Sequence, residues 1–440
     1  MSRQEFLPYA LPLIEEDDIA EVVDSLKSNW ISKGPKTMKF EKRFAEYVGA
    51  KQAIAVNSCT AGLHLSLLAA GIGPGDEVIT TPMTFVASAN VILHCGAKPV
   101  FVDIDPLTMI IDVNKIEGAI TPRTKGIIPV HIAGHPCPMD EIMAIAEKHH
   151  LFVLEDAAHA VYTQYKGKLI GTQGNAVSFS FYATKNLSTG EGGMVTTNDE
   201  ALAEKIRIMS LHGMSRTAWN RYSAAGSWYY EILYPGYKDN MTDIQAGLGL
   251  AQLAKLERMQ GRREEIAARY NEAFGKMPEL EIPTELDYAR HAWHLYILKL
   301  NLDTLSIDRG QFIEELKAEN IGTSVHFIPV HFQPYYRDTF GYKPGDYPHA
   351  EAVFERIISL PLYPKMTAQD TQDVIEAVER VVERSRQLGL GPRCRGGSGV
   401  KIDVENDLGQ AGKRCGNGRQ LRGRLATSGL DGKRIRVSLV

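Results

Sequence analysis

Short apolar runs alternate with longer stretches of helical spacing between about residues 50 and 200. The apolar runs are rich in Val, Ile and Phe and predict strands, whereas the stretches between them predict helices. Such alternation favours a mostly parallel sheet with helices on both faces. Ligands of these sheets gather beyond the carboxyl ends of the strands, so we expect the chemically important residues directly after the apolar runs. The predicted strands span 52–58, 76–81, 98–105, 125–131, 151–156, 176–181 and 194–198, and the predicted helices span 61–71, 86–96 and 139–150.

The pattern changes after about residue 240. Residues 243–275 carry Ala, Leu and charged residues at helical spacing, which predicts one long helix or a helix pair that bridges two domains. Beyond it, the pattern predicts strands over 291–302 and 323–331 and helices over 309–322 and 367–389. We therefore expect three parts: a large domain over 1–275 that includes the N-terminal segment and the bridging helix, a smaller α+β domain over 276–389, and a tail over 390–440.

Composition places the chain among ordinary globular proteins, because its 440 residues are 44% hydrophobic and 23% charged. A formal net charge of -4 gives no global basic field, which argues against nucleic acid as a partner. Residues 391–440 differ, with 11 Gly and with 11 Lys or Arg against 4 Asp or Glu. Such a segment is typical of a flexible or non-native appendage, and it has no part in the mechanism below.

The apolar runs also indicate where in the cell the protein is expected. None approaches the roughly 18 residues that a membrane span needs, and the N-terminus lacks the basic-then-apolar pattern of a signal peptide. We expect a cytoplasmic protein with no membrane partner. The 5 cysteines are widely spaced without a C-x-x-C pair, which predicts free thiols. The short segment with His131, His135 and Cys137 lacks a second ligand pair, and no metal site is predicted.

A turn rich in small polar residues, Asn57 to Gly62, lies between a predicted strand and a predicted helix. Ser58, Thr60 and free backbone N–H groups would therefore meet at a helix N-terminus, which is a natural anion site. Taken alone, the same residues are also typical of an ordinary helix cap.

An acidic pair, Glu155 and Asp156, ends the apolar strand predicted over 151–156. A buried carboxylate at the edge of a sheet needs a cationic or N–H partner. A protonated pyridine nitrogen is one such partner, and keeping it protonated makes the ring an electron sink. The alternative is a purely structural acid.

Lys185 follows the strand predicted over 176–181 and precedes the glycine-rich turn at 190–193. A lysine that is desolvated there, next to a cationic ring, would have a lowered pKa, which favours a Schiff base and later proton transfer. A single lysine after a strand is more often a surface residue. Asp156 and the turn at Ser58 supply the missing ring and phosphate partners, and together they predict a cofactor-binding lysine.

These motifs, over about residues 5–388, resemble the sugar aminotransferases of the DegT/DnrJ/EryC1/StrS family. The resemblance implies the aspartate-aminotransferase-like fold (fold type I), a three-layer α/β domain with a mostly parallel sheet and a smaller C-terminal α+β domain. It also implies pyridoxal 5'-phosphate (PLP) as the cofactor. The segments that carry it are 30–35, 58–62, 75–78, 129–131, 155–159, 180–186, 190–193 and 236–238.

The resemblance further implies roles for individual residues. Lys185 forms the Schiff base and is the catalytic residue, Asp156 pairs with the pyridine nitrogen, and an aromatic residue covers the ring. In the family, the loop that resembles residues 236–243 reaches the active site of the neighbouring subunit of a homodimer. The implied contacts are Thr60, Ala61 and Ser180 to the phosphate, Phe85 to the ring face, His159 near the ring oxygen, Asn240 or Lys238 to the phosphate across the dimer, and Ser32, Lys33 and His326 to the substrate.

The implied reaction transfers an amino group from L-glutamate, which leaves as 2-oxoglutarate, to a keto-sugar nucleotide. Such products serve cell-envelope polysaccharides, including lipopolysaccharide, or secondary metabolites. Segments such as PGYKDNMTDIQA resemble the branch that aminates UDP-4-keto-L-arabinose. The chain departs from the common loop pattern Gly-Tyr-Asn-Tyr-Arg, so Lys238 or Lys33 would replace the missing arginine. Two alternatives are a pyridoxamine-phosphate dehydratase, where a histidine replaces the lysine, and a non-catalytic relative.

Overall fold

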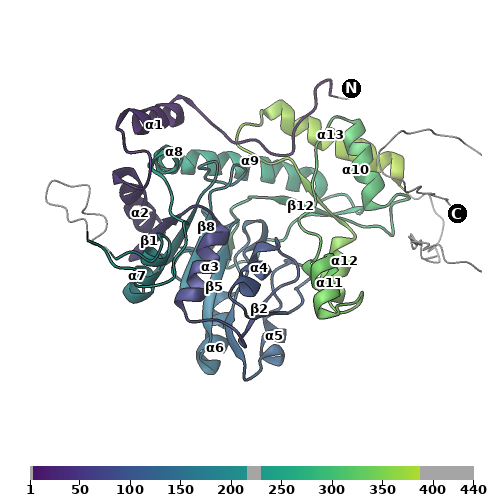
Figure 1. Ribbon diagram of the computed structural model, residues 1–440. Coiled ribbons are helices and arrows are strands. Elements are labelled where there is room, and N and C mark those ends of the chain that lie inside the picture. Colours follow the sequence, from purple (N-terminus) through teal and green to yellow (C-terminus); the bar gives the residue numbers. More distant parts are fainter. Residues whose placement is uncertain (1–2, 216–228, 387–440) are drawn as a thin grey trace, which may run out of the picture. The chain divides into compact units, whose positions relative to one another are not determined.

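The computed structural model describes residues 3–215 and 229–386, and these residues belong to one compact unit. A seven-stranded sheet lies at its centre (Figure 1). All neighbouring strands are parallel except β9, which is antiparallel to both of its neighbours. The predicted, mostly parallel sheet is confirmed. In spatial order its strands are β1 (Gln52–Val56), β9 (Gly193–Thr197), β8 (Ala176–Ser180), β5 (Phe152–Ala157), β4 (Thr124–Ile127), β2 (Glu77–Thr80) and β3 (Lys98–Phe101).

Helices cover both faces of this sheet, as the alternating pattern predicted. Leu63, Val91 and Ile206 pack in the core on one face, and Phe40 and Ile142 pack in the core on the other. Each buried side chain of this size contributes roughly 1.5–3 kcal/mol. The first face carries α3 (Cys59–Ala69), α4 (Ala87–His94) and α7 (Glu200–Met209), and the second carries α2 (Pro35–Val48) and α6 (Met139–His149).

The bridging segment is a helix pair, α8 (Asp243–Ala254) and α9 (Leu256–Phe274), which are separated at Lys255. Lys255 Nζ donates hydrogen bonds of 2.6 Å to both Asp17 and Asp18. The break therefore ties the pair to α1 (Glu16–Lys27). The remaining short elements are α5 (Val113–Ile116), η1 (Glu117–Ala119), η2 (Ile132–Gly134), β6 (Gln164–Tyr165), β7 (Lys168–Leu169) and β11 (Ala289–Arg290).

A second, three-stranded antiparallel sheet has its own apolar core, built with side chains of α9. Its domain boundary near residue 275 stays a prediction, and the predicted tail from 390 lies outside the described residues. No helix in the described part of the chain is long and apolar enough to cross a membrane. The elements here are β10 (Leu280–Glu281), β12 (Tyr296–Leu300), α10 (Arg309–Ala318), η4 (Val330–Phe332), α11 (Pro334–Phe340), α12 (Pro348–Phe354), β13 (Ile357–Leu360) and α13 (Ala368–Ser385).

Two predicted strands need correction. The strand predicted over 323–331 is wrong, because only Ser324 forms an isolated bridge, to Ser359. Pro329 has no N–H to donate to a sheet and lies directly before η4. The strand predicted over 291–302 is shorter than expected and begins at Tyr296. The residues before it bond instead to the loop that follows β4.

Helix α2 receives its cap from another helix. Its own N-cap is Gly34, which has no side chain to offer. The buried carboxylate of Asp243, at the start of α8, accepts hydrogen bonds from the backbone N–H groups of Gly34, Lys36 and Thr37 and from the Thr37 hydroxyl, at 2.6–2.9 Å. One side chain thus satisfies the free donors of α2 and fixes the segment that carries Ser32 and Lys33.

Replacing Asp243 by Ala should lower the free energy of unfolding by about 3 kcal/mol, because several buried donors would lose a charged acceptor together. Urea denaturation followed by fluorescence measures this change. Glu46→Ala is the control, since Glu46 forms an exposed pair with Lys42 and its loss should change stability by less than about 0.5 kcal/mol. Equal effects in the two variants would contradict the capping role.

Candidate active site

The ends of β5 and β8 and the start of α3 converge beyond the carboxyl edge of the large sheet. Asp156, near the end of β5, is buried. Its carboxylate accepts hydrogen bonds from Ser88 Oγ at 2.6 Å and Ala158 N at 3.1 Å, and the Cys59 thiol lies 3.9 Å away. Within the described residues its hydrogen-bond donors are all neutral. A buried carboxylate in this setting is suited to a cationic ligand group.

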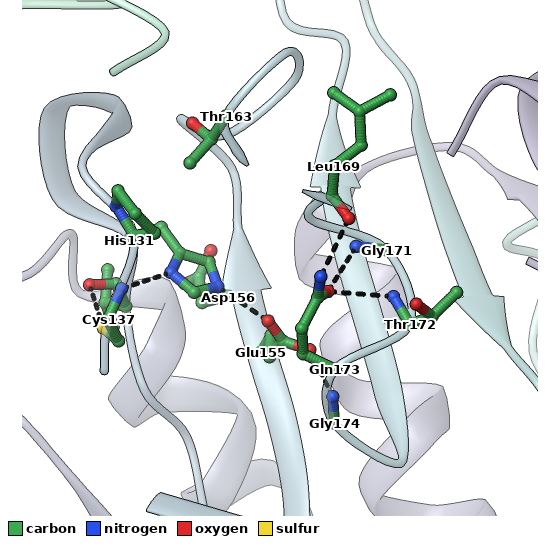
Figure 2. Close-up of polar contacts among 12 residues, drawn as sticks. His131, Cys137, Glu155, Asp156, Thr163, Leu169, Gly171, Thr172, Gln173 and Gly174 are labelled. Carbon is green, nitrogen blue, oxygen red and sulfur yellow. Dashed lines mark hydrogen bonds and ion pairs between the residues drawn. The ribbon is translucent and has the colours of Figure 1, made fainter. Parts of the chain in front are cut away.

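Glu155, the neighbour of Asp156, points to the opposite face of β5, because side chains alternate along a strand. Figure 2 shows it bonded to His131, whose Nε2 lies 2.9 Å from Glu155 Oε2. The His131 Nδ1 accepts from Cys137 N at 3.0 Å, so the ring proton is on Nε2 and is donated to Glu155. His131 and Cys137 are thus engaged in fixing the loop after β4.

Lys185 lies beyond the end of β8, and its Nζ is 3.4 Å from Nε2 of His294. Burial lowers the pKa of the Lys185 amine to about 8, although nearby Cys59 and Asp156 oppose the shift. The neutral, nucleophilic amine is therefore far more abundant near neutral pH than for an exposed lysine. This geometry gives Lys185 the desolvated setting that the sequence predicted.

The predicted phosphate turn caps α3. Ser58 is the N-cap residue and its Oγ accepts from Ala61 N at 3.1 Å, while Thr60 lies in the first helical turn. Gly193 of β9 packs against this turn so closely that a Cβ would lie 2.5 Å from the carbonyl carbon of Ser58. Ser180, at the end of β8, accepts from Tyr182 N at 3.3 Å. A helix N-terminus with hydroxyl groups beside it is suited to an anion.

His159 is buried beside the predicted ring site, and burial holds its pKa well below the ordinary value. Its Nδ1 accepts from Ala133 N at 3.1 Å, so the single proton of the neutral ring is on Nε2. The ring centroid lies 4.5 Å from that of His294 and 5.9 Å from that of Phe327. Phe327 in turn lies 6.0 Å from Phe85, which is 60% exposed.

The other predicted contacts are more scattered. In the loop at 236–243, Lys238 Nζ donates to Asn240 Oδ1, and the loop backbone bonds to the end of β1. Lys33 is buried with its Nζ 3.4 Å from Glu41, and the exposed Ser32 accepts from Asp243 N through its carbonyl. These contacts do not join the four residues to Lys185 within this chain.

His326 lies closer to Lys185. Burial lowers the pKa of its ring to about 4, and the charge of Lys185 adds to the shift, so the two groups sense each other. Its Nδ1 is 2.8 Å from Ser359 Oγ. Sequence reasoning missed His294, because no spacing relates residue 294 to residue 185, and it included Asn186 only as part of the segment 180–186 without a role.

These groups fit PLP. A helix N-terminus with hydroxyl groups suits its phosphate, a buried carboxylate with neutral donors suits its pyridinium nitrogen, and a desolvated lysine suits its aldehyde. The residues that would hold it are Lys185, Asp156, Ser58, Thr60 and Ser180. The fit rests on the burial and hydrogen bonds described above.

Comparisons with known proteins lead to the same conclusion about the cofactor. The model of the DegT/DnrJ/EryC1/StrS aminotransferase family matches residues 12–379. The chain is 62% identical over 386 residues to an uncharacterised protein of Methanocaldococcus jannaschii. The aligned region covers 88% of this chain and 100% of that protein. It is 60% identical over 382 residues to the spore coat polysaccharide biosynthesis protein SpsC of Bacillus subtilis. The aligned region covers 87% of this chain and 98% of SpsC.

Solved structures share the fold. Helicobacter pylori PseC, an aminotransferase involved in the biosynthesis of pseudoaminic acid, matches with a TM-score of 0.80 and 30% identity over 87% of this chain and 100% of its own. A Streptococcus pneumoniae protein solved in its PMP form matches with a TM-score of 0.82 and 37% identity over 86% of this chain and 99% of its own. The same protein was also solved in its PLP form. The chain therefore belongs to the DegT/DnrJ/EryC1/StrS aminotransferase family and is a PLP-dependent sugar aminotransferase.

Proposed function

We propose that this enzyme moves an amino group from L-glutamate to a keto-sugar nucleotide, with a UDP-4-keto sugar such as a UDP-4-keto-pentose as the acceptor. The observation that carries the proposal is a groove of about 630 Å³, one wall of which, Phe327, contacts His159 of the candidate site. Its volume is within the range of roughly 300–1,000 Å³ typical of small-molecule sites.

The groove shares a wall with the cofactor site. Phe85 and Phe327 line it, and Phe327 also contacts the buried ring of His159. Farther along, the lining is aromatic and includes Tyr335, which is 59% exposed, and Tyr336. Tyr336 is buried, but exposed rings such as those of Tyr335 and Phe85 suit the flat faces of a sugar or a nucleobase. A ligand longer than a free sugar would fill the groove and place its sugar near Lys185.

The chain supplies the proton chemistry. Bound PLP supplies an electron sink that stabilises negative charge on the reacting carbon. Asp156 would hold the ring nitrogen, and His159 would offer its Nε2–H as a hydrogen-bond donor. Lys185, once its amine is free, carries the proton between the two reacting carbons, since a pKa of about 8 lets it both accept and release a proton. A dehydratase-like reaction is disfavoured because Lys185 stands where that branch has a histidine.

We also place the enzyme in the cytoplasm as a homodimer whose active sites are shared. Support for the dimer comes from exposed apolar side chains that precede Lys238, namely Tyr229, Tyr230, Ile232 and Leu233. Exposed apolar groups gathered along one segment are typical of an interface. In such a dimer, Lys238 or Asn240 would reach the phosphate of the partner's cofactor.

Lys185→Ala should abolish covalent attachment of the cofactor. Borohydride reduction of the wild-type holoenzyme should leave a phosphopyridoxyl group on the peptide that contains Lys185, as peptide mass spectrometry would show. Lys166→Ala is the control, because Lys166 is exposed and pairs with Asp140. A reduced adduct of normal yield in Lys185→Ala would refute the assignment.

Reloading of the apoprotein with PLP should accelerate with rising pH and level off above about pH 8. The pKa of Lys185 is lowered, so its reactive neutral amine dominates above that value instead of above the usual 10.5. Stopped-flow absorbance measures the rate, and identification of the labelled peptide assigns it to Lys185. A midpoint near 10 would show that the amine is not desolvated.

Tyr335→Ala should raise the KM for the sugar nucleotide by about 10-fold, since one aromatic stacking contact is worth roughly 1–3 kcal/mol. The half-reaction with L-glutamate should be unchanged. Leu107→Ala, at another exposed apolar residue, is the control. A panel of keto-sugar nucleotides tested in the second half-reaction identifies the acceptor, and turnover of free keto sugars alone would contradict the proposal.

A further inference from the structure

We infer that His294 is a positioning residue for Lys185, held in a single tautomer by a chain of hydrogen bonds that begins at Glu264. The inference deepens the role proposed for Lys185 and rests on that proposal. His294 comes from the segment between β11 and β12, and thus from a part of the chain remote from β8.

The chain of hydrogen bonds has a forced direction. The carboxylate of Glu264 can only accept, so the Nε2 of Gln260, 3.4 Å away, donates to it. Gln260 Oε1 must then face Asn186, whose Nδ2 donates to it at 3.2 Å and to the carbonyl of Ala292 at 2.7 Å. Two acceptors on its nitrogen side fix the orientation of the Asn186 amide.

The same logic sets the tautomer of His294. Asn186 Oδ1 lies 3.2 Å from His294 Nδ1, and an amide oxygen can only accept, so Nδ1 carries the proton. The lone pair of the neutral ring is therefore on Nε2, which faces Lys185 Nζ at 3.4 Å. His294 thus accepts a hydrogen bond from the lysine amine and orients it.

His294 does not compete for the proton. Burial holds the pKa of its ring well below the ordinary value, and the groups that face it, Lys185 first and then His159, Arg263 and His326, lower it further whenever they are protonated. Among these groups Arg263 is buried and donates to the carbonyls of Trp293 and His294. The imidazole therefore stays neutral and the mobile proton stays on Lys185. A histidine that served only to fill the core would need neither a fixed tautomer nor a lone pair aimed at the lysine.

Two substitutions separate positioning from packing. His294→Leu removes the acceptor, whereas His294→Gln keeps one, since its amide can donate to Asn186 and accept from Lys185. An acceptor stabilises the protonated amine, so its loss in His294→Leu should shift the pH midpoint of apoprotein reloading to lower pH by about half to one unit. The kcat of the same variant should fall by about 10- to 100-fold, with the KM values changed by less than about 3-fold.

His294→Gln should keep the wild-type midpoint and lose less than about 5-fold in kcat. The control is His291→Gln, a buried histidine on the same segment whose Nδ1 accepts from Trp293 N. It should leave the midpoint unchanged. If His294→Leu does not fold, Asn186→Ala tests the same relay, because it frees the tautomer and should move the midpoint in the same direction.

The outcomes distinguish the two proposals. If the labelled lysine is not Lys185, the proposed role of Lys185 fails. If Lys185 is labelled but the midpoint is the same in wild type, His294→Leu and Asn186→Ala, only the positioning role of His294 is overturned. Equal losses in His294→Leu and His294→Gln would likewise overturn it, since packing and not the acceptor would then matter.

Discussion

Desolvation of the Lys185 amine is the constraint on which the rest of the site depends. An ammonium group is costly to bury, so the lysine is compatible with this position only if it readily becomes neutral. The surrounding histidines, His159, His294 and His326, are themselves neutral because burial lowers the pKa of each ring. The buried guanidinium of Arg263 is engaged by the carbonyls of Trp293 and His294, whereas Asp156 accepts only from neutral donors among the described residues and is thus able to hold a cationic ring.

Strand β5 and the loop after β4 connect the surroundings of Lys185 to the second sheet through hydrogen bonds. One face of the strand presents Asp156, and Glu155 on the other face holds His131 and the loop. The loop carbonyls of Ala133 and Gly134 accept from the N–H groups of His294 and Ala292. The segment before β12 is therefore irregular for a reason: its backbone bonds to the loop in place of a sheet, which brings His294 to the lysine.

Sequence reasoning identified those parts of the site that depend on neighbouring residues along the chain. The order of strand, polar turn and helix identifies the cap at Ser58, and an acid at the end of an apolar run identifies Asp156, because strand ends of a parallel sheet meet at one edge. It was less successful beyond residue 290. Apolar residues such as Val325 and Phe327 were read as part of a strand, although they line the groove next to Phe85.

The sequence by itself determined the layered α/β fold and the position of the Ser58 turn, Asp156 and Lys185 at the ends of strands, because periodicity and strand-end chemistry are properties of neighbours along the chain. Only the tertiary structure decided that Asp243 caps α2, that His294 meets Lys185, and that the groove is aromatic. Each of these joins residues separated by roughly a hundred positions or more along the chain, and no local pattern reports which distant side chains share a hydrogen bond or a wall.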